Sequence, residues 1–386
     1  MGRSRPRVSS RTPLGELAKR IRARTARIGV IGAGWWATYA HLPTLKEHPD
    51  AELVALAEIR PDVLAKAAKV YGVERTYADY RDMLANERLD GVVVAVWHAA
   101  HYEVARACLE RGLHLLLEKP MVLKAAHARE LCRLAEARGL QIIVGYTWHY
   151  LPMSPRAQEA IQSGRLGRVH YISDVFASAP LNLYRGDDHS DQPEMASQYP
   201  VFGPGDVYSD PERSGGGQGH LQVTHSAALM FYLTGLKPVS VQALMDNLDV
   251  RVDVVDAMIV RLDNGGLATV GSTGATAGGE GKLDIQVYCE KGWVDLDYIA
   301  CRGLIQYADG SVEDLTPAPG TPDISYREYT LYPAHLPARN LVDVILGRAP
   351  NRSPAEYGWR TVELLDAAYR SAAQQGKEVT VASLYE

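Results

Sequence analysis

The feature that most constrains the fold is a regular alternation of apolar strands and amphipathic helices between Arg27 and Gly145. Apolar runs such as "DGVVVAVW" (Asp90–Trp97) are continuous, as expected for strands whose two faces are both covered. The runs between them, such as "HYEVARACLERG" (His101–Gly112), have helical spacing and end at glycine. Because such repeats favour a parallel sheet with right-handed crossover helices, we predict a doubly wound α/β domain over residues 26–147.

Two glycines end the first of these strands and give the pattern Gly32-x-Gly34-x-x-Ala37. The first glycine permits a tight turn, and the second lets a pyrophosphate approach the N–H groups at the start of the next helix. In this strand–turn–helix setting, the motif predicts a dinucleotide-binding Rossmann domain. Trp35 and Trp36 follow the second glycine, and they either line the nicotinamide or substrate side of the site or close the helix against a neighbouring domain.

An acidic residue at the end of the second predicted strand bears on the choice of dinucleotide. Glu58 is placed to accept hydrogen bonds from the adenosine ribose hydroxyls and to repel a 2′-phosphate, which favours NAD over NADP. Arg60 follows two residues later and is able to bind that phosphate, so NADP remains the less favoured alternative.

Beyond about residue 150 the pattern changes to longer β-like runs, such as Val169–Ala179, that fold back at turn residues such as Asp263-Asn264-Gly265. This pattern predicts a second, α+β domain with an open, mainly antiparallel sheet over residues 148–350. A helix within residues 351–386 is expected to pack back on the rest of the chain. An open sheet face favours a homo-oligomer, either a dimer or a tetramer.

Charge is spread unevenly along the chain. Residues 1–24 carry eight Lys or Arg and one Glu, a net +7, so the rest of the chain carries −12 when the total is −5. We therefore separate residues 1–25 as a basic N-terminal extension, while the acidic remainder argues against nucleic acid as a partner. No apolar run approaches the roughly 20 residues of a membrane span. Four scattered cysteines favour a reducing, cytoplasmic setting and no zinc or other metal site.

A charged pair lies at the carboxyl end of another predicted strand, in "LHLLLEKPM". Glu118 and Lys119 stand where parallel sheets bind their ligands. A lysine close to a nicotinamide cation is favoured in its neutral form, so Lys119 is suited to accept or relay a hydroxyl proton. Outside such a site it would be an ordinary surface lysine.

The Glu118-Lys119-Pro120 sequence, the glycine turn and the strand "VVVAVWHAAH" together resemble the glucose–fructose oxidoreductase / inositol dehydrogenase / MocA family, over nearly the whole chain from Arg27. The resemblance implies that Lys119 is the catalytic or proton-relay lysine. The proline and asparagine usual in the family before this motif correspond to Trp97 and His98 here, followed by the matching His101. These differences predict an altered nicotinamide pocket.

The resemblance also implies a catalytic histidine in the second domain. A glycine cluster in "SGGGQGHLQVTH" leads into a helix that carries His225, and an imidazole is a natural acid or base near neutral pH. Without this context, a histidine on an apolar helix would be a core residue. The family's aspartate four residues earlier is replaced by Leu221, whereas Gln222 and Thr224 resemble some branches of the family. His220 is a candidate substitute for the missing acid.

Several aromatic and cationic residues near the cleft are candidates for substrate binding. Aromatic rings suit the apolar face of a sugar, and arginine suits an anionic substituent. The long polar stretch from Leu181 to Gly219 is interpreted as a lid, a substrate loop or an oligomer arm. The candidates are Trp148, His149, Tyr150, Arg156, Tyr184, Arg185, His220, Gln222 and Thr224.

Three functions follow from this reading. The first is an NAD-dependent oxidoreductase that abstracts hydride from a CH–OH carbon of a sugar, cyclitol or glycoside, with Lys119 and His225 transferring the proton. The second is a glycosidase that retains NAD and cleaves, by oxidation, elimination, water addition and reduction, a glycoside that could be anionic or sulfonated. The third is a non-catalytic, sugar-responsive regulator, supported only by the basic extension.

Overall fold

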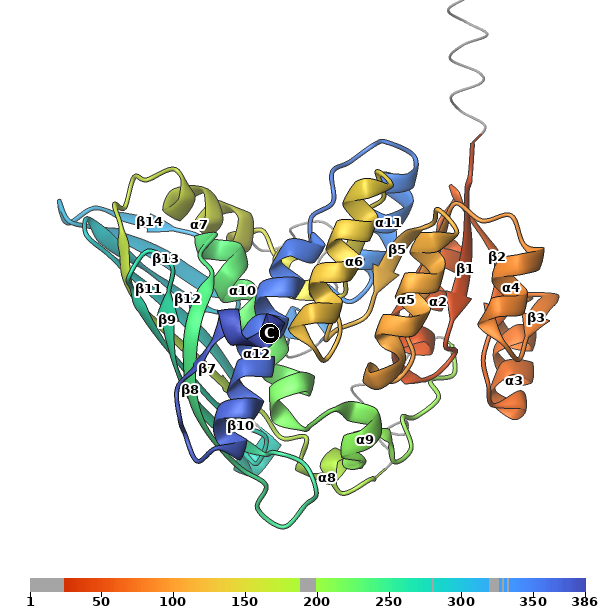
Figure 1. Ribbon diagram of the computed structural model, residues 1–386. Helices are drawn as coiled ribbons and strands as arrows, with labels where there is room; N and C mark the ends of the chain where they lie inside the picture. Colours follow the sequence, from red (N-terminus) through yellow and green to blue (C-terminus); the bar gives the residue numbers. More distant parts are fainter. Residues whose placement is uncertain (1–23, 188–198, 280, 319–325, 328–329, 332) are drawn as a thin grey trace, which may run out of the picture.

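The computed structural model describes residues 24–187, 199–279, 281–318, 326–327, 330–331 and 333–386. The basic extension predicted over residues 1–25 therefore lies outside the described residues, apart from its end at residues 24 and 25. The described chain forms two units that lie next to each other, each built around its own sheet (Figure 1). Within these ranges, no helix is both long enough and apolar enough to cross a membrane.

The first sheet consists of six parallel strands, which confirms the predicted doubly wound domain. The strands lie in the order β3-β2-β1-β4-β5-β6, so the direction of winding reverses between β1 and β4. Ligands of such sheets bind outside the carboxyl ends of the strands at this reversal. The strands are β1 (Ala26–Ile31), β2 (Ala51–Ala57), β3 (Arg75–Tyr77), β4 (Gly91–Val94), β5 (His114–Leu117) and β6 (Ile142–Val144).

Helices cover both faces of this sheet, which explains why its strands read as continuous apolar runs. Apolar side chains of α2, α3 and α11 pack on one face, and those of α4, α5 and α6 pack on the other. Helix α11, which the sequence analysis grouped with the second domain, therefore packs on the first sheet, because Leu341 and Ile345 reach its core. The helices are α2 (Leu42–Glu47), α3 (Pro61–Tyr71), α4 (Tyr80–Asn86), α5 (His101–Glu110), α6 (Ala125–Ala137) and α11 (Leu336–Ile345).

The second sheet has nine strands in the order β14-β13-β12-β11-β7-β10-β9-β8-β17. Strand β7 pairs in parallel with β10, and the other pairings are antiparallel, which confirms the predicted mainly antiparallel sheet. The strands are β7 (Val169–Ala177), β8 (Pro238–Asp246), β9 (Val255–Leu262), β10 (Leu267–Thr273), β11 (Lys282–Cys289), β12 (Gly292–Asp297), β13 (Arg302–Tyr307), β14 (Val312–Asp314) and β17 (Val379–Thr380), with a separate pair β15 (Tyr326–Arg327) and β16 (Thr330–Leu331).

Among the described residues, helices cover only one face of the second sheet. In β9, Met258 and Val260 are buried under helices, whereas Ile259 between them is exposed. Helices α7, α10 and α12 pack on the buried face, and α10 is buried on all sides (Figure 1). The opposite face carries exposed apolar side chains such as Ile259 and Leu267. The remaining helices are α7 (Met153–Gln162), α8 (Leu181–Tyr184), α9 (Pro211–Ser214), α10 (Thr224–Thr234) and α12 (Ala355–Ala373).

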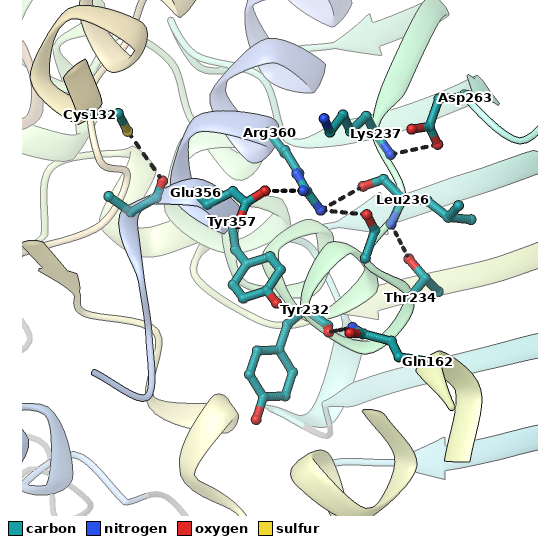
Figure 2. A network of polar contacts seen from close by, with 12 residues as sticks. Cys132, Gln162, Tyr232, Thr234, Leu236, Lys237, Asp263, Glu356, Tyr357 and Arg360 are labelled. Atoms are coloured by element: carbon teal, nitrogen blue, oxygen red, sulfur yellow. Dashed lines mark hydrogen bonds and ion pairs between the residues drawn. The ribbon is translucent and has the colours of Figure 1, made fainter. Parts of the chain in front are cut away.

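Polar contacts fix α12 against the end of α10. Figure 2 shows Arg360 of α12 beside the end of α10, where its guanidinium donates to the carbonyl oxygens of Gly235 at 2.7 Å and of Leu236 at 3.2 Å. Glu356 pairs with the same guanidinium from one turn earlier. Gly235 and Leu236 directly follow Thr234, the last residue of α10, so Arg360 holds α12 against the turn that leaves this helix.

Candidate active site

A cavity of about 1410 Å³ lies at the carboxyl ends of the first sheet and is closed by residues of the second unit. Strand ends of the first unit supply the residues that face a dinucleotide, and α10 with the end of β7 supplies the opposite wall. The sequence-predicted residues that line this cavity are Gly32, Gly34, Trp35, Trp36, Glu58, Arg60, Trp97, His98, Glu118, Lys119, Trp148, Gln222 and His225.

The glycine turn has the geometry that a dinucleotide requires. Gly32 adopts a φ of +88°, and a Cβ atom there would lie 2.3 Å from the carbonyl oxygen of Ala95, so no other residue fits without a shift. Trp35 packs edge-on against Trp36, with ring centroids 6.1 Å apart, and against Tyr208 at 5.9 Å. The nearest group to a Cβ at Gly34, outside its chain neighbours, would be the Arg60 guanidinium at 3.0 Å. The Trp36 indole therefore does not come within 4 Å of this position.

The acidic residue after β2 points at this turn. The Glu58 carboxylate accepts a hydrogen bond from the backbone N–H of Ala33 at 2.9 Å, and Glu58 is buried. The Arg60 guanidinium donates to the same carboxylate at 3.0 Å and 3.3 Å, which neutralises the cation. A helix start for a pyrophosphate and a carboxylate for ribose hydroxyls fit NAD. Gly32, Gly34 and Glu58 are the residues that would hold it.

Lys119 joins the two units across the cavity. Its Nζ donates to the backbone carbonyl of Leu221 at 2.9 Å, and the Lys119–Pro120 peptide bond is cis. Enclosure by the cavity walls removes water from the ammonium group and lowers the pKa of Lys119 to about 8, although the neighbouring Glu118 opposes this effect. A substantial fraction of the amine is therefore neutral near physiological pH. The Leu221 carbonyl supplies an acceptor where the sequence lacks the expected aspartate.

Glu118 is held by a partner that the sequence analysis missed. Its Oε1 lies 2.8 Å from Nε2 of His41, which is fully buried in the helix after the glycine turn, and its Oε2 accepts the backbone N–H of Lys119 at 3.1 Å. Gly145 leaves room for this carboxylate, because a Cβ there would lie 2.5 Å from Oε1. The one sign of His41 in the sequence was a polar residue on an otherwise apolar helix face.

His225 lies on α10 and lines the same cavity as Lys119. It is 4% exposed, and its ring packs edge-on against Trp148 with centroids 5.0 Å apart. Burial first, and then the charge of Lys119, lower the pKa of His225 well below its ordinary value. The imidazole is therefore neutral at pH 7. The structure thus brings the predicted amine and imidazole to one cavity.

The residues after β4 divide between the cavity wall and its support. Trp97 lines the cavity and is 36% exposed. His98 also lines it, with Nδ1 2.8 Å from the carbonyl oxygen of Ser214 in the second unit. Burial lowers the pKa of His98 well below its usual range. His101 lies behind the wall, with Nδ1 2.7 Å from the Pro120 carbonyl oxygen.

A segment of the second unit, residues 199–210, crosses toward the glycine turn, and we call it the crossing loop. The backbone N–H of Phe202 donates to Oγ1 of Thr38 at 3.1 Å, and Gly203–Tyr208 line the cavity. Tyr208, which sequence reasoning did not select, lies 5.5 Å from the ring of His98. The long polar stretch therefore borders the cavity, although its residues 188–198 lie outside the described chain.

Three predicted substrate residues are buried away from the cavity lining. His149 stacks on Tyr232 with centroids 4.4 Å apart, and burial lowers its pKa to about 3. Tyr150 donates to Asn340 at 3.0 Å. His220 stacks on Tyr369 at 4.5 Å and has a pKa lowered to about 4 by burial.

The other four candidates also contact protein groups rather than the cavity. Tyr184 donates to the Gln218 side chain at 2.7 Å, and Thr224 lies 3.2 Å from the Tyr146 hydroxyl. Two exposed arginines form surface ion pairs: Arg156 with Glu313 at 3.2 Å, and Arg185 with Asp249 at 2.8 Å. Neither arginine faces the cavity. Among the described residues, no group of three or more His, Cys, Asp or Glu is arranged to hold a metal ion.

Comparison with known sequences locates the chain among redox enzymes. The "Oxidoreductase family, NAD-binding Rossmann fold" matches residues 26–146, and the "GFO/IDH/MocA C-terminal domain" matches residues 155–295. Myo-inositol 2-dehydrogenase of Thermotoga maritima is 29% identical over 162 residues, 41% of this chain and 48% of that protein. D-apiose dehydrogenase of Paraburkholderia graminis is 29% identical over 158 residues, 39% of this chain and 42% of that protein. The alignments thus span about half the length of these curated relatives.

Solved structures share the whole architecture. Levoglucosan dehydrogenase, in complex with NADH and levoglucosan, superposes with a TM-score of 0.73 at 19% identity, covering 93% of this chain and 100% of that chain. An oxidoreductase domain protein from Kribbella flavida gives a TM-score of 0.76 at 19% identity, with 93% and 99% coverage. At this identity the likeness establishes the fold, and the two sequence matches establish the lineage: the chain belongs to the GFO/IDH/MocA oxidoreductase family.

Proposed function

We propose that the protein is an NAD-dependent oxidoreductase acting on a CH–OH carbon of a sugar or cyclitol. The observation that carries the proposal is the placement of Lys119 and His225 on the cavity that also contains the glycine turn and Glu58. Bound NAD would supply the hydride acceptor, which has no counterpart among protein side chains. Relatives that bear the names of myo-inositol, D-apiose and levoglucosan dehydrogenases support a polyol substrate.

The proton chemistry is assigned to the amine and the imidazole. With a pKa of about 8, Lys119 accepts the hydroxyl proton at Nζ when it is neutral and returns it in the reverse direction. The neutral His225 orients the same hydroxyl through a hydrogen bond. Burial opposes charging of the imidazole, so the hydroxyl proton goes to Lys119. Trp148 next to His225 offers an aromatic face for the apolar side of a sugar ring.

The charges on the cavity wall favour a neutral substrate. Arg60 pairs with Glu58, and Arg213 pairs with Asp206 at 2.8 Å, so the guanidinium groups on the wall are already neutralised. Arg156 and Arg185 are paired elsewhere on the surface. An anionic sugar would therefore find no free cation except a protonated Lys119 among the described lining residues.

The test is a screen of neutral polyols, matched to their uronate forms, with NAD or NADP as acceptor. We expect NADH formation with at least one neutral sugar or cyclitol and little with the matched uronates. Failure of every polyol with both dinucleotides, by a protein that still binds NADH, would contradict the proposal.

A glycosidase that retains NAD is a second candidate, because the crossing loop ties the cofactor side of the cavity to the second unit. Such closure favours a dinucleotide that stays bound between turnovers. Cleavage of a nitrophenyl glycoside with no net NADH, by protein purified without added NAD, would favour this candidate. Net NADH formation from a free polyol would favour the dehydrogenase.

A further inference from the structure

The glycine cluster before His225 packs directly on two side chains of the second unit. A Cβ at Gly216 would lie 2.2 Å from the Tyr369 hydroxyl, and one at Gly217 would lie 2.1 Å from the carbonyl oxygen of Asp253. A Cβ at Gly219 would again meet the Tyr369 hydroxyl, at 2.7 Å. These positions require glycine because no space remains beside Asp253 and Tyr369.

Asp253 satisfies three successive backbone donors of this segment. Its carboxylate accepts the N–H of Gly217 through Oδ1 and the N–H of Gly219 through Oδ2, both at 2.7 Å. Its backbone carbonyl accepts the N–H of Gln218 at 2.8 Å. The Tyr369 hydroxyl donates to Oδ1 at 2.8 Å, and Asp253 is only 4% exposed. These N–H groups begin a helix and have no partner within it, so Asp253 caps the helix from a distant part of the chain.

The hydrogen bonds continue from this cap to the cavity. Gly217 is held by Asp253 through its N–H, and its carbonyl accepts the N–H of Leu221 at 2.8 Å. The carbonyl of Leu221 then accepts Nζ of Lys119 at 2.9 Å. Asp253 thus reaches the Lys119 amine through a continuous chain of three hydrogen bonds. The same helical segment, η6 (Gly219–Val223), runs directly into α10, which carries His225.

From this geometry we infer that Asp253, assisted by Tyr369, is a positioning residue that sets the Leu221 carbonyl against the Lys119 amine. The expected change in kcat rests on the proposed function, whereas the expected change at the Lys119 amine does not. Other titratable groups that face Lys119 are Glu118, which favours its charge, and His98 and His225, whose own pKa values its charge lowers. The Leu221 carbonyl stabilises the ammonium form, so its displacement would lower the pKa of Lys119 further.

The test compares Asp253→Asn with the wild-type protein and with Asp366→Asn. In Asp253→Asn, the NH₂ group of the amide would face one of the two backbone N–H groups from which the carboxylate now accepts a hydrogen bond. Asp366 is a matched control, since it is a buried carboxylate whose charge acts on His220 as that of Asp253 does, but its hydrogen bonds go to the N–H of Ala125 and to Arg370 instead of the glycine segment. We expect Asp253→Asn to lower kcat about 10- to 100-fold with little change in KM, the cost of a small misplacement of a reacting group. The acid limb of the kcat profile should move to lower pH, and Asp366→Asn should leave it unchanged.

A second readout does not depend on activity. The rate at which Lys119 reacts with an acetylating reagent, followed by mass spectrometry across pH, reports the pKa of the amine. Asp253→Asn should shift that profile to lower pH, and Tyr369→Phe should give a smaller shift in the same direction. An unchanged acetylation profile in both variants would overturn the inference, even if kcat fell. If no polyol is turned over by the wild type but the acetylation profile shifts, the proposed function fails and the positioning role stands.

Discussion

The Lys119 amine faces a cavity but has a single backbone carbonyl as its acceptor among the described residues. Its charged form gains one hydrogen bond, to Leu221, and loses most of its hydration. An amine balanced in this way is ready to change its protonation state with a bound hydroxyl, which is what a general base near neutral pH requires. The neighbouring His225 is also held neutral by burial, so neither group carries a fixed positive charge into the cavity at mildly alkaline pH.

Removing the amine should separate chemistry from binding. We expect Lys119→Ala to lower kcat by about 10²- to 10⁴-fold, the usual contribution of a positioned base. Binding of NADH, measured by fluorescence titration, should change by less than about threefold, which is under 1 kcal/mol. Lys124→Ala, on an exposed lysine nearby, serves as the control. A kcat within about threefold of the wild type would remove Lys119 from the proposed chemistry.

The same amine predicts a pH dependence with opposite signs in the two directions. Oxidation needs neutral Lys119, so kcat for oxidation should rise as pH increases through about 8. Reduction needs the protonated amine, so its kcat should fall over the same range. Steady-state rates in both directions test this, and a flat profile between pH values on either side of the pKa would contradict it.

The local helix at residues 147–150 explains why Trp148 lines the cavity while the next two residues do not. Residues 147–150 form a 3₁₀-helix, in which successive side chains point about 120° apart. Trp148 therefore faces the cavity, whereas His149 and Tyr150 turn into the interior, where they contact Tyr232 and Asn340. The sequence predicts the end of a strand here but not the short helix that follows, so it does not separate these three aromatic residues.

The crossing loop gives a prediction for cofactor exchange. Tyr208 packs edge-on against Trp35 and His98, contacts of a kind worth about 0.5–1.5 kcal/mol beyond buried area. Tyr208→Ala should therefore accelerate release of NADH by roughly 2- to 10-fold, as followed by stopped-flow fluorescence. Tyr171→Ala, on the open face of the second sheet, is a control remote from the cavity. Equal release rates for all three proteins would mean that the crossing loop does not restrain the cofactor.

Across the whole molecule, buried titratable groups predict how stability depends on pH. Five buried histidines, once unfolded, return to an ordinary pKa of 6.5, so the unfolded chain binds more protons below that pH and stability falls as pH falls. Asp174, with a pKa raised to about 8 by burial, and Asp256, also raised, act in the opposite sense above about pH 4. The histidines outnumber these carboxyls, so stability should decline below pH 6.5. The five are His98, His101, His149, His220 and His225.

Thermal unfolding followed by circular dichroism measures this dependence. Each unbalanced proton changes the free energy of unfolding by about 1.4 kcal/mol per pH unit. His149→Gln should reduce the slope between pH 4 and 6.5, because one histidine with a pKa lowered to about 3 is lost. A melting temperature that rises on acidification through this range would contradict the assignment of neutral buried histidines.

Features that depend on neighbouring residues could be predicted from the sequence, whereas contacts between residues far apart in the sequence could not. The glycine turn, Glu58 and Lys119 stand at strand ends with local signals, so the first sheet and its ligand edge were predictable. Asp253 acts on residues more than 30 positions earlier, and His41 meets Glu118 at a separation of 77. Such contacts depend on how distant segments of one unit pack together, which no local pattern encodes. The packing of α11 on the first sheet was missed for the same reason.

The C-terminal part of the chain serves both units at once. Helix α11 supplies a layer of the first sheet's core, α12 packs on the second sheet, and β17 pairs with β8 at the edge of that sheet. A protease cut near Arg352 would leave α11 on the larger fragment and detach α12 and β17, so it would uncover the second sheet rather than release an intact unit. The two units should unfold in a calorimeter as a single cooperative transition, because the C-terminal segment contributes residues to the hydrophobic cores of both.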